Sequence, residues 1–402
     1  MVRLFHLVLV AVLFSSLAHA QPRVSEEEFL SILRGPHPGL VALSERLGTA
    51  RAERVRAGLL PNPVGGFERE APRGGAEQSR WRIAWTPPLD GRRGAAVRAA
   101  EAGLQAASHE LEASRLSLRS ELRQRFAEWS LTAERTAVIR SHLGLIERLA
   151  EQGRARARSG EASGLAARRL ALAALEVQAE AARTEASATN ARALALAWHR
   201  ELSADAQAER PPLPFLPDTI RTPLRSDLLA RRFEVEQARW KLRLGRRLFQ
   251  FPELGFGWQR IDEQIATREG PVVSVSWPLP LFERQQPERI EAAARLSAAE
   301  ARLELASIRA GAKLVAARAA YQGLRQAALQ AIETAAGSDQ VVESATATFR
   351  LGESRLTDLL ETLRSVLAAR LAALDLYETA LEAHRNLELA AGRALPADGE
   401  SR

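Results

Sequence analysis

Apolar residues, mostly Ala and Leu, recur every three to four positions among Arg and Glu along much of the chain, which is the pattern of amphipathic helices. In one stretch Leu104, Leu111 and Leu118 follow a heptad spacing, as in helices that pack against other helices. This stretch predicts a long helix over about 93–158, and a similar stretch predicts a second long helix over about 287–350. Shorter helices are predicted over about 25–58, 165–198, 218–247 and 353–389.

Two segments between the helices alternate apolar and polar residues with a period of two, which is the pattern of β-strands. The segments span about 62–86 and 252–277, and each is predicted to hold two strands. The alternation fits a sheet with one face in lipid, and it equally fits a small soluble sheet packed on helices. The large residues that share the apolar face are Trp81, Ile83, Trp85, Leu254, Phe256, Trp258, Val273, Val275 and Trp277.

The number of strands favours the lipid-facing interpretation. Four strands in one chain cannot close a sheet, and open strand edges are not tolerated in a bilayer. Copies of the chain must therefore share a barrel, and three copies give twelve strands, within the even-numbered range of outer-membrane barrels. The sequence thus predicts a mostly α-helical protein with a small β part, assembled as a trimer with a shared transmembrane β-barrel.

The chain resembles itself when it is shifted by 192 positions without a gap. In this register Trp85 matches Trp277, and Gly160 matches Gly352, so rare residues coincide over a long distance. Each half then has the same order of helix, two strands, long helix and shorter helix, which is the signature of a duplication. The predicted parts are a first repeat at 21–202, a Pro-rich connector at 203–217, a second repeat at 218–392 and a disordered tail at 393–402.

The N-terminus has the pattern of a secretory signal. Arg3 precedes an apolar run that ends in Ala18-His19-Ala20, a cleavage site of the small-x-small type. We predict that residues 1–20 are a signal peptide and that the mature chain is exported. Residue 21 is Gln and the chain has no Cys, so neither a disulfide framework nor a bacterial lipid anchor on the mature N-terminus is expected.

The charge of the chain does not indicate a nucleic-acid partner. The formal net charge is +7, but the cations are spread along helical faces among nearly as many acids, and only Lys241 and Lys313 are lysines. Such dispersed Arg and Glu are typical of the solvated surface of helical bundles. We therefore expect no nucleic-acid binding.

Candidate chemistry is sparse. The histidines of the mature chain are scattered without a paired-ligand spacing, and each is expected to be a surface residue of a helix. The glycine pairs match neither a phosphate-binding loop nor a dinucleotide fingerprint. We therefore predict a protein that is not an enzyme and that holds no cofactor and no metal ion.

Several segments resemble TolC-like outer-membrane efflux proteins. They are 37–40, His-Pro-Gly-Leu, and 60–63, Leu-Pro-Asn-Pro, which enters the first strand. The strand exits at 85–93, Trp-Thr-Pro-Pro-Leu-Asp-Gly-Arg-Arg, and at 277–282, Trp-Pro-Leu-Pro-Leu-Phe, resemble the family too. The second exit is most similar to the heavy-metal branch of the family, which serves resistance-nodulation-division pumps.

The resemblance implies a bacterial outer-membrane homotrimer with a twelve-stranded barrel in outer-membrane lipid and a long periplasmic α-barrel. It further implies an exit duct for metal cations or drugs in a tripartite efflux system, with a periplasmic membrane-fusion adaptor and an inner-membrane pump as partners. The alternative function left open by the residues is a soluble periplasmic coiled-coil scaffold or adaptor without a channel.

The resemblance also assigns roles at the helical-hairpin tips. Phe349, Arg350 and Gly352 match the family's tip motif, and with Gly160 of the first repeat they are expected to contact the adaptor. Asp358 and Glu361 match acidic residues that constrict the pore entrance, while Ser354 replaces an Arg that can lock the closed state. Asp358 and Glu361 could instead form an ordinary helix start, with Thr357 as the cap.

Overall fold

The computed structural model describes residues 22–395 except 36, 74, 161–162, 200, 217–224, 247–250, 264 and 280. The predicted signal peptide and residues 396–402 of the predicted tail lie outside the described residues. The chain forms two compact units, and each combines segments of both predicted repeats. Unit 1 comprises Met1–Pro38, Leu116–Arg221 and Ala312–Arg402, and unit 2 comprises Gly39–Arg115 and Thr222–Gly311.

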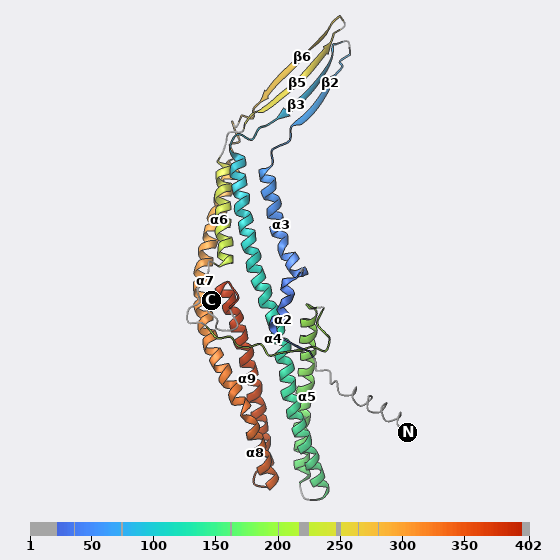
Figure 1. The fold of residues 1–402 in the computed structure, drawn as a ribbon, viewed down its shortest axis with the longest axis vertical. Helices are drawn as coiled ribbons and strands as arrows, with labels where there is room; N and C mark the ends of the chain where they lie inside the picture. The colour runs from blue at the N-terminus through green and yellow to red at the C-terminus, as the bar shows by residue number, and fades with distance from the viewer. Residues whose placement is uncertain are drawn as a thin grey trace, which may run out of the picture. The chain divides into compact units, whose positions relative to one another are not determined.

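Unit 2 contains a four-stranded antiparallel sheet in the order β2-β3-β5-β6 (Figure 1). Its strands are β2 (Val64–Glu70), β3 (Glu77–Trp85), β5 (Glu253–Asp262) and β6 (Thr267–Ser276). The helices that lead to and from the sheet are α3 (Pro38–Gly58), the first part of α4 (Arg92–Arg158), α6 (Ser226–Gly245) and the first part of α7 (Gln286–Ala336). The prolines after α3, Pro61 and Pro63, prevent this helix from continuing into β2.

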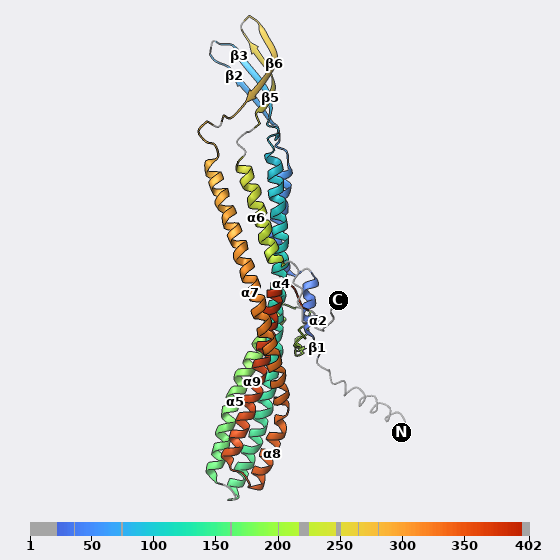
Figure 2. The same cartoon turned by 90° about the vertical axis from the view of Figure 1, so that its left-hand side faces the viewer.

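Unit 1 contains a bundle in which α4, α5 (Gly164–Leu196), α8 (Ser338–Leu351) and α9 (Leu356–Ala391) lie side by side (Figure 2). Its shared core includes Ile139 and Ile146 of α4, Leu170 of α5 and Leu359 of α9, all at most 2% exposed. The remaining elements are β1 (Arg23–Val24), α2 (Glu26–Leu30), the 3₁₀ turn η1 (Ser31–Arg34) and β4 (Gln207–Ala208).

Three features differ from the expected elements. The helix expected over 25–58 is divided, because Gly35 adopts an extended backbone after η1 and Pro38 begins a new helix, a position that proline favours. The helix expected over 287–350 is interrupted at Gly337, a poor helix former. The parallel pair of β1 with β4 was not expected, because strands of two residues carry no periodic pattern.

The fold is therefore mostly helical with a small β part, as the sequence predicts. Within the part of the chain that the structure describes, no helix has an apolar stretch long enough to cross a bilayer.

Candidate functional site

The sheet of unit 2 has one continuous apolar face. The strand register pairs Ile83 with Phe256 and Phe256 with Val273, and neighbouring rows pair Trp81 with Trp258. Directly paired residues lie on the same face of a sheet. All nine residues expected on this face are exposed, from 38% for Trp85 to 74% for Val273. The structure thus brings them together, and their contact with lipid stays a prediction.

Two further residues belong to this face and were missed. Phe67 of β2 pairs with Trp81, with ring centroids 4.4 Å apart, and it is exposed. Pro271 of β6 pairs with Trp258. Two glycines precede Phe67, so β2 shows no clear alternation of apolar and polar residues. Pro271 lies two residues before Val273, so extending the alternation of β6 by one step predicts it.

The opposite face of the sheet is polar and contains a close backbone contact. Arg80 donates a hydrogen bond to the side-chain oxygen of Gln259 at 3.2 Å, and Gln259 donates to Gln78 at 3.3 Å. On the same face a Cβ atom at Gly257 would lie 2.2 Å from the carbonyl oxygen of Trp81. No side chain fits there without separating β3 from β5, so the sheet requires glycine at this position.

Gly160 and Gly352 end the helices at the two hairpin tips. Both have left-handed backbones, with φ of +80° and +78°, a conformation that glycine adopts without strain. At the second tip the N–H of Gly352 bonds to the carbonyl of Phe349 at 3.1 Å, and that of Glu353 bonds to Thr348 at 3.0 Å. This pattern terminates α8 as a Schellman motif. The glycines therefore have a structural role whether or not they contact a partner.

The other residues of the second tip differ in their surroundings. Phe349 packs against the hydrophobic core of the bundle, whereas Arg350 is exposed to solvent. Ser354 is partly buried, and its hydroxyl has no hydrogen-bond partner among the described residues. Arg350 is therefore available for a partner, and Phe349 holds the tip to the bundle.

Asp358 lies in the first turn of α9, as the alternative interpretation expects. Its carboxylate accepts hydrogen bonds from the backbone N–H of Arg355 at 3.3 Å and from the hydroxyl of Thr357 at 3.1 Å. Thr357 is not the cap, since Arg355 occupies the N-cap position. An acid in the first turn also interacts favourably with the helix dipole.

Asp358 and Glu361 nevertheless share an exposed surface. Both line a groove of about 1100 Å³ between α9 and the α7–α8 segment, together with small residues such as Ala331, Ser338 and Thr362. Hydrogen bonds at the start of α9 account for the position of Asp358. Glu361 has no such role, and it forms no ion pair within the described part of the chain. The groove places two carboxylates side by side on one surface of unit 1.

Three histidines expected on helix surfaces are buried, so that prediction was wrong for them. His142, His199 and His384 are 7%, 8% and 1% exposed. They lie on faces of the chain that pack inward in unit 1, a property that sequence position alone does not reveal. Among the described residues, no cluster of three or more potential metal ligands is present.

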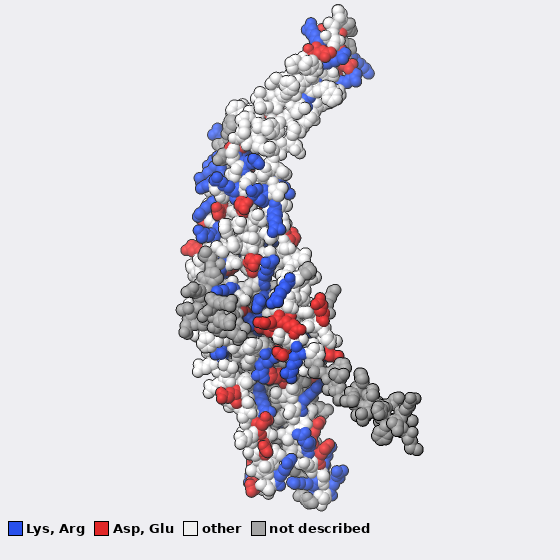
Figure 3. All heavy atoms as spheres, viewed as in Figure 1, with Lys and Arg blue, Asp and Glu red and all other residues white. Residues whose placement is uncertain are grey.

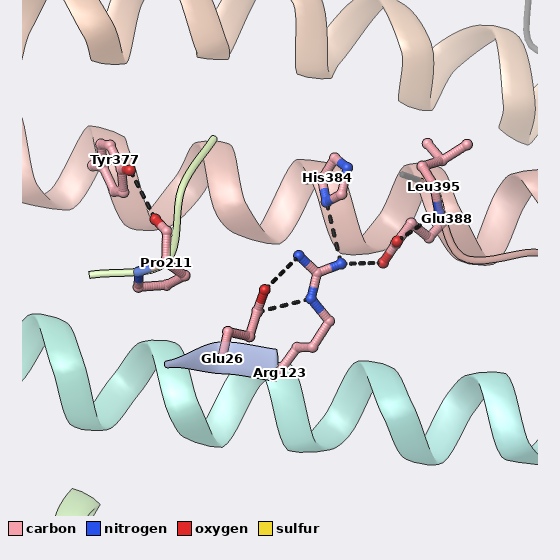
Figure 4. Close-up of polar contacts among 7 residues, drawn as sticks. All are labelled: Glu26, Arg123, Pro211, Tyr377, His384, Glu388 and Leu395. Carbon is pink, nitrogen blue, oxygen red and sulfur yellow. Dashed lines mark hydrogen bonds and ion pairs between the residues drawn. The ribbon is translucent and has the colours of Figure 1, made fainter. Parts of the chain in front are cut away.

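His384 belongs to a buried ionic network that sequence reasoning missed (Figure 4). Arg123 of α4 binds Glu26 of α2 through two hydrogen bonds, at 2.8 and 3.1 Å, and forms an ion pair with Glu388 of α9. Glu388 also accepts the backbone N–H of Leu395 at 2.8 Å. The network therefore joins the first described residues to the C-terminal segment through α4.

The network fixes the protonation state of His384. Arginine can only donate hydrogen bonds, so Nδ1 of His384, 3.4 Å from Arg123, must be the acceptor. Burial, reinforced by the charges of Arg123 and Arg385, lowers the pKa of His384 to about 3. Burial alone would lower the pKa of Arg123, but the carboxylates of Glu26 and Glu388 raise it above its ordinary value. His384 is thus neutral at physiological pH.

The lowered pKa predicts a loss of stability in acid. Below the ordinary histidine pKa of about 6.5 the unfolded chain gains a proton at His384, which the folded chain accepts only near pH 3. Between these values the free energy of unfolding should fall by up to about 1.4 kcal/mol per pH unit relative to His384→Asn, whose amide oxygen can replace Nδ1. Denaturant unfolding at a series of pH values measures the difference. If stability falls equally with pH in the unaltered protein and in His384→Asn, His384 does not have the lowered pKa. The same conclusion follows if His109→Asn, at a partly exposed histidine, changes the pH dependence as much as His384→Asn does.

Comparisons with known proteins agree with this architecture. Residues 224–393 match the model of the family described as outer membrane efflux protein. The cobalt-zinc-cadmium resistance protein CzcC of Cupriavidus metallidurans is 25% identical over 380 residues, which cover 91% of this chain and 90% of that protein.

Solved structures share the fold. The crystal structure of CusC superimposes with a TM-score of 0.76 at 15% identity, covering 92% of each chain. The open state of the MtrE outer membrane channel of Neisseria gonorrhoeae gives 0.72 at 22% identity, covering 94% of this chain and 91% of that one. The family match over residues 224–393, the relative over nine tenths of the chain and the shared fold agree: the chain is similar to outer membrane efflux proteins along most of its length.

Proposed function

We propose that this protein is the outer-membrane channel of a tripartite efflux system, a passive duct for solutes delivered by an inner-membrane pump and a periplasmic adaptor. The observation that carries the proposal is the continuous, exposed apolar face of the sheet, from Phe67 through Trp81 and Trp258 to Pro271. A soluble scaffold would have to cover this face, since exposed apolar patches of this kind mark membrane or protein contacts. Efflux through a duct requires no catalytic group and no cofactor.

The strand lengths support a membrane-spanning sheet. β3 has nine residues, and β5 and β6 have ten, which is the length that a tilted strand needs to cross a bilayer. β2 and β6 are the outer strands of the sheet, so each has an edge free for pairing within the described chain. In lipid these edges must pair with other copies, and three chains close a barrel of twelve strands.

The two sequence repeats have matched parts in this proposal. Each repeat, 21–202 and 218–392, supplies one strand hairpin to the barrel and one helical hairpin to a periplasmic α-barrel. The hairpin tips at Gly160 and at Arg350–Gly352 then face the adaptor. Exposed Arg350, beside the left-handed turn of Gly352, is the side chain best placed for that contact.

A metal cation is the solute class that the acidic groove favours. Asp358 and Glu361 lie on one surface, and three copies would give rings of carboxylates at the pore entrance, which attract cations and repel anions. CzcC, the relative over nine tenths of the chain, is a cobalt-zinc-cadmium resistance protein. The inner-membrane pump that the present protein serves would then be of the resistance-nodulation-division type.

Single-channel recording in planar bilayers tests this function. The purified mature protein is expected to form cation-preferring pores, and Asp358→Asn with Glu361→Gln is expected to lower the cation preference several-fold, because the fixed negative charge is removed. Glu343→Gln, an exposed acid of α8 outside the groove, is the matched control and should leave selectivity unchanged.

The outcomes separate the hypotheses. Pores with unchanged selectivity in the double variant would refute the acidic ring while leaving the channel intact. A monomeric protein that is extracted in aqueous buffer and forms no pores would instead support the soluble periplasmic scaffold.

A further inference from the structure

A group of cations lies where the helices of unit 2 meet the sheet. α3 and α6 end there, and α4 and α7 begin there (Figure 1). We define the helix-end basic cluster as the exposed residues Arg56, Lys241, Arg246, Arg284 and Arg289. In the described part of the chain the side chains of these five residues form no ion pair and no hydrogen bond, although most other arginine side chains near them do.

The opposite end of the same sheet is different. Its charges pair with one another: Arg69 with Glu77, Arg260 with Asp262 at 3.0 Å, and Arg268 with Glu263 at 3.9 Å. Figure 3 shows an uncharged band over the strands, with mixed charges at the loop tips and mainly cations where the helices begin. The two ends of the apolar band therefore present different electrostatic environments.

Helix termini of both signs lie at the cluster, because α3 and α6 end there and α4 and α7 begin there. α4 begins with Arg92 and Arg93 and has no acid in its first turn, although the N-terminal end of a helix dipole favours anions. The side chain of Arg93 bonds to the carbonyl of Gly58 at 3.1 Å and so ties α4 to the end of α3. Asp90 accepts the backbone N–H of Arg92 at 3.0 Å and so compensates the start of α4. The positive charge that is left for an external anion is therefore that of the five unpaired cations of the cluster.

Exposed apolar side chains are interleaved with these cations. They include Phe282, which is 91% exposed, immediately before the segment that contains Arg284. Aromatic and aliphatic groups beside Lys and Arg are typical of protein segments at the membrane–water interface. The others are Leu59, Leu60, Leu89, Leu279 and Leu281.

We propose that the helix-end basic cluster binds the phosphate groups of anionic phospholipids in the leaflet that borders the helices. The inference rests on the proposed function, because the apolar band must lie in a bilayer for the cluster to reach the headgroups. Trp85 and Trp277 end the apolar rows next to the cluster, at the level where tryptophan marks the interface. The cations then meet lipid phosphates, and the apolar residues of the strand exits enter the adjoining acyl region.

Lipid retention in bilayer discs tests the proposal. The mature protein is reconstituted from phosphatidylethanolamine alone or mixed with phosphatidylglycerol, and the lipids that remain bound after extraction are quantified by mass spectrometry. We expect enrichment of phosphatidylglycerol, falling with salt concentration because exposed charges are screened. Arg246→Gln with Arg284→Gln and Arg289→Gln should reduce the enrichment at least about tenfold, since each cation near an anionic surface contributes roughly fivefold.

The matched control removes three cations from the other end of the sheet, through Arg69→Gln, Arg260→Gln and Arg268→Gln, and should keep the enrichment. Equal loss in both variants, or no enrichment in the unaltered protein, would overturn the proposal. A cluster variant that fails to assemble even in pure phosphatidylethanolamine would show that the cations contact protein instead. Failure of the unaltered protein to enter any bilayer would refute the proposed channel itself.

Discussion

Replacing Arg123 with methionine is expected to lower the free energy of unfolding by about 3–5 kcal/mol, because the change leaves the buried carboxylate of Glu388 and the partly buried carboxylate of Glu26 without their cation. Arg123 is 5% exposed, and it is the cationic partner of both Glu26 and Glu388. Met fills much of the same volume, so the loss would come mainly from the uncompensated charges. Denaturant unfolding of the detergent-solubilised protein measures the loss.

Two variants sharpen this test. Arg140 lies on α4 like Arg123, but its ion pair with Glu185 of α5 is exposed. Arg140→Met should therefore leave the unfolding midpoint nearly unchanged. Adding Glu26→Gln and Glu388→Gln to Arg123→Met should recover part of the lost stability, because neutral amides tolerate burial better than unpaired carboxylates. If Arg123→Met is as mild as Arg140→Met, the network does not hold the terminal segments as described.

Replacing Gly257 with alanine is expected to cost about 3 kcal/mol of stability, at the upper end for overpacking, and to reduce the yield of assembled protein. The new Cβ would lie 2.2 Å from the carbonyl oxygen of Trp81, an atom of the backbone that no side-chain rotation can move away. β3 and β5 must therefore separate locally, at the centre of the sheet. Semi-native electrophoresis, with and without heating, reports the fraction of assembled protein.

Gly66 provides the matched control for this position. It pairs with Arg82, the same residue that pairs with Gly257 from the other side, and nothing lies within 4 Å of a Cβ placed there. Gly66→Ala should therefore assemble like the unaltered protein. Equal assembly of both alanine variants would contradict the close approach of β3 and β5 at Gly257.

The identity and extent of most elements follow from the sequence alone. The helix expected over 93–158 corresponds to α4 at Arg92–Arg158, and the two strands expected within 62–86 correspond to β2 and β3. The alternation of Trp81, Ile83 and Trp85 was enough to place them on one face. Such features depend on local hydrogen-bond geometry and periodicity, which neighbouring residues determine together.

The candidate site was predictable only in part. Gly160 and Gly352 were identified correctly as turn positions, because only glycine adopts their backbone readily. The alternative interpretation placed the cap of α9 at Thr357, and the structure has it at Arg355, since a helix start can move by a residue or two when several polar residues compete for the cap. The roles of Asp358 and Glu361 at a pore entrance stay predictions, because they depend on other copies of the chain.

The tertiary structure decided what lies inside. In α9 the stripe of Tyr377, Leu381, His384 and Glu388 has helical spacing, and its polar members could equally have faced solvent. They are buried because Arg123 contacts them. Arg123 is 261 residues away from His384 in sequence, yet the two side chains lie within hydrogen-bond distance. The sequence by itself determined the helices, the strands and their apolar faces, since these arise from repeats of a few residues. Only packing between distant segments could select which polar side chains are buried, because their partners supply the compensating charge.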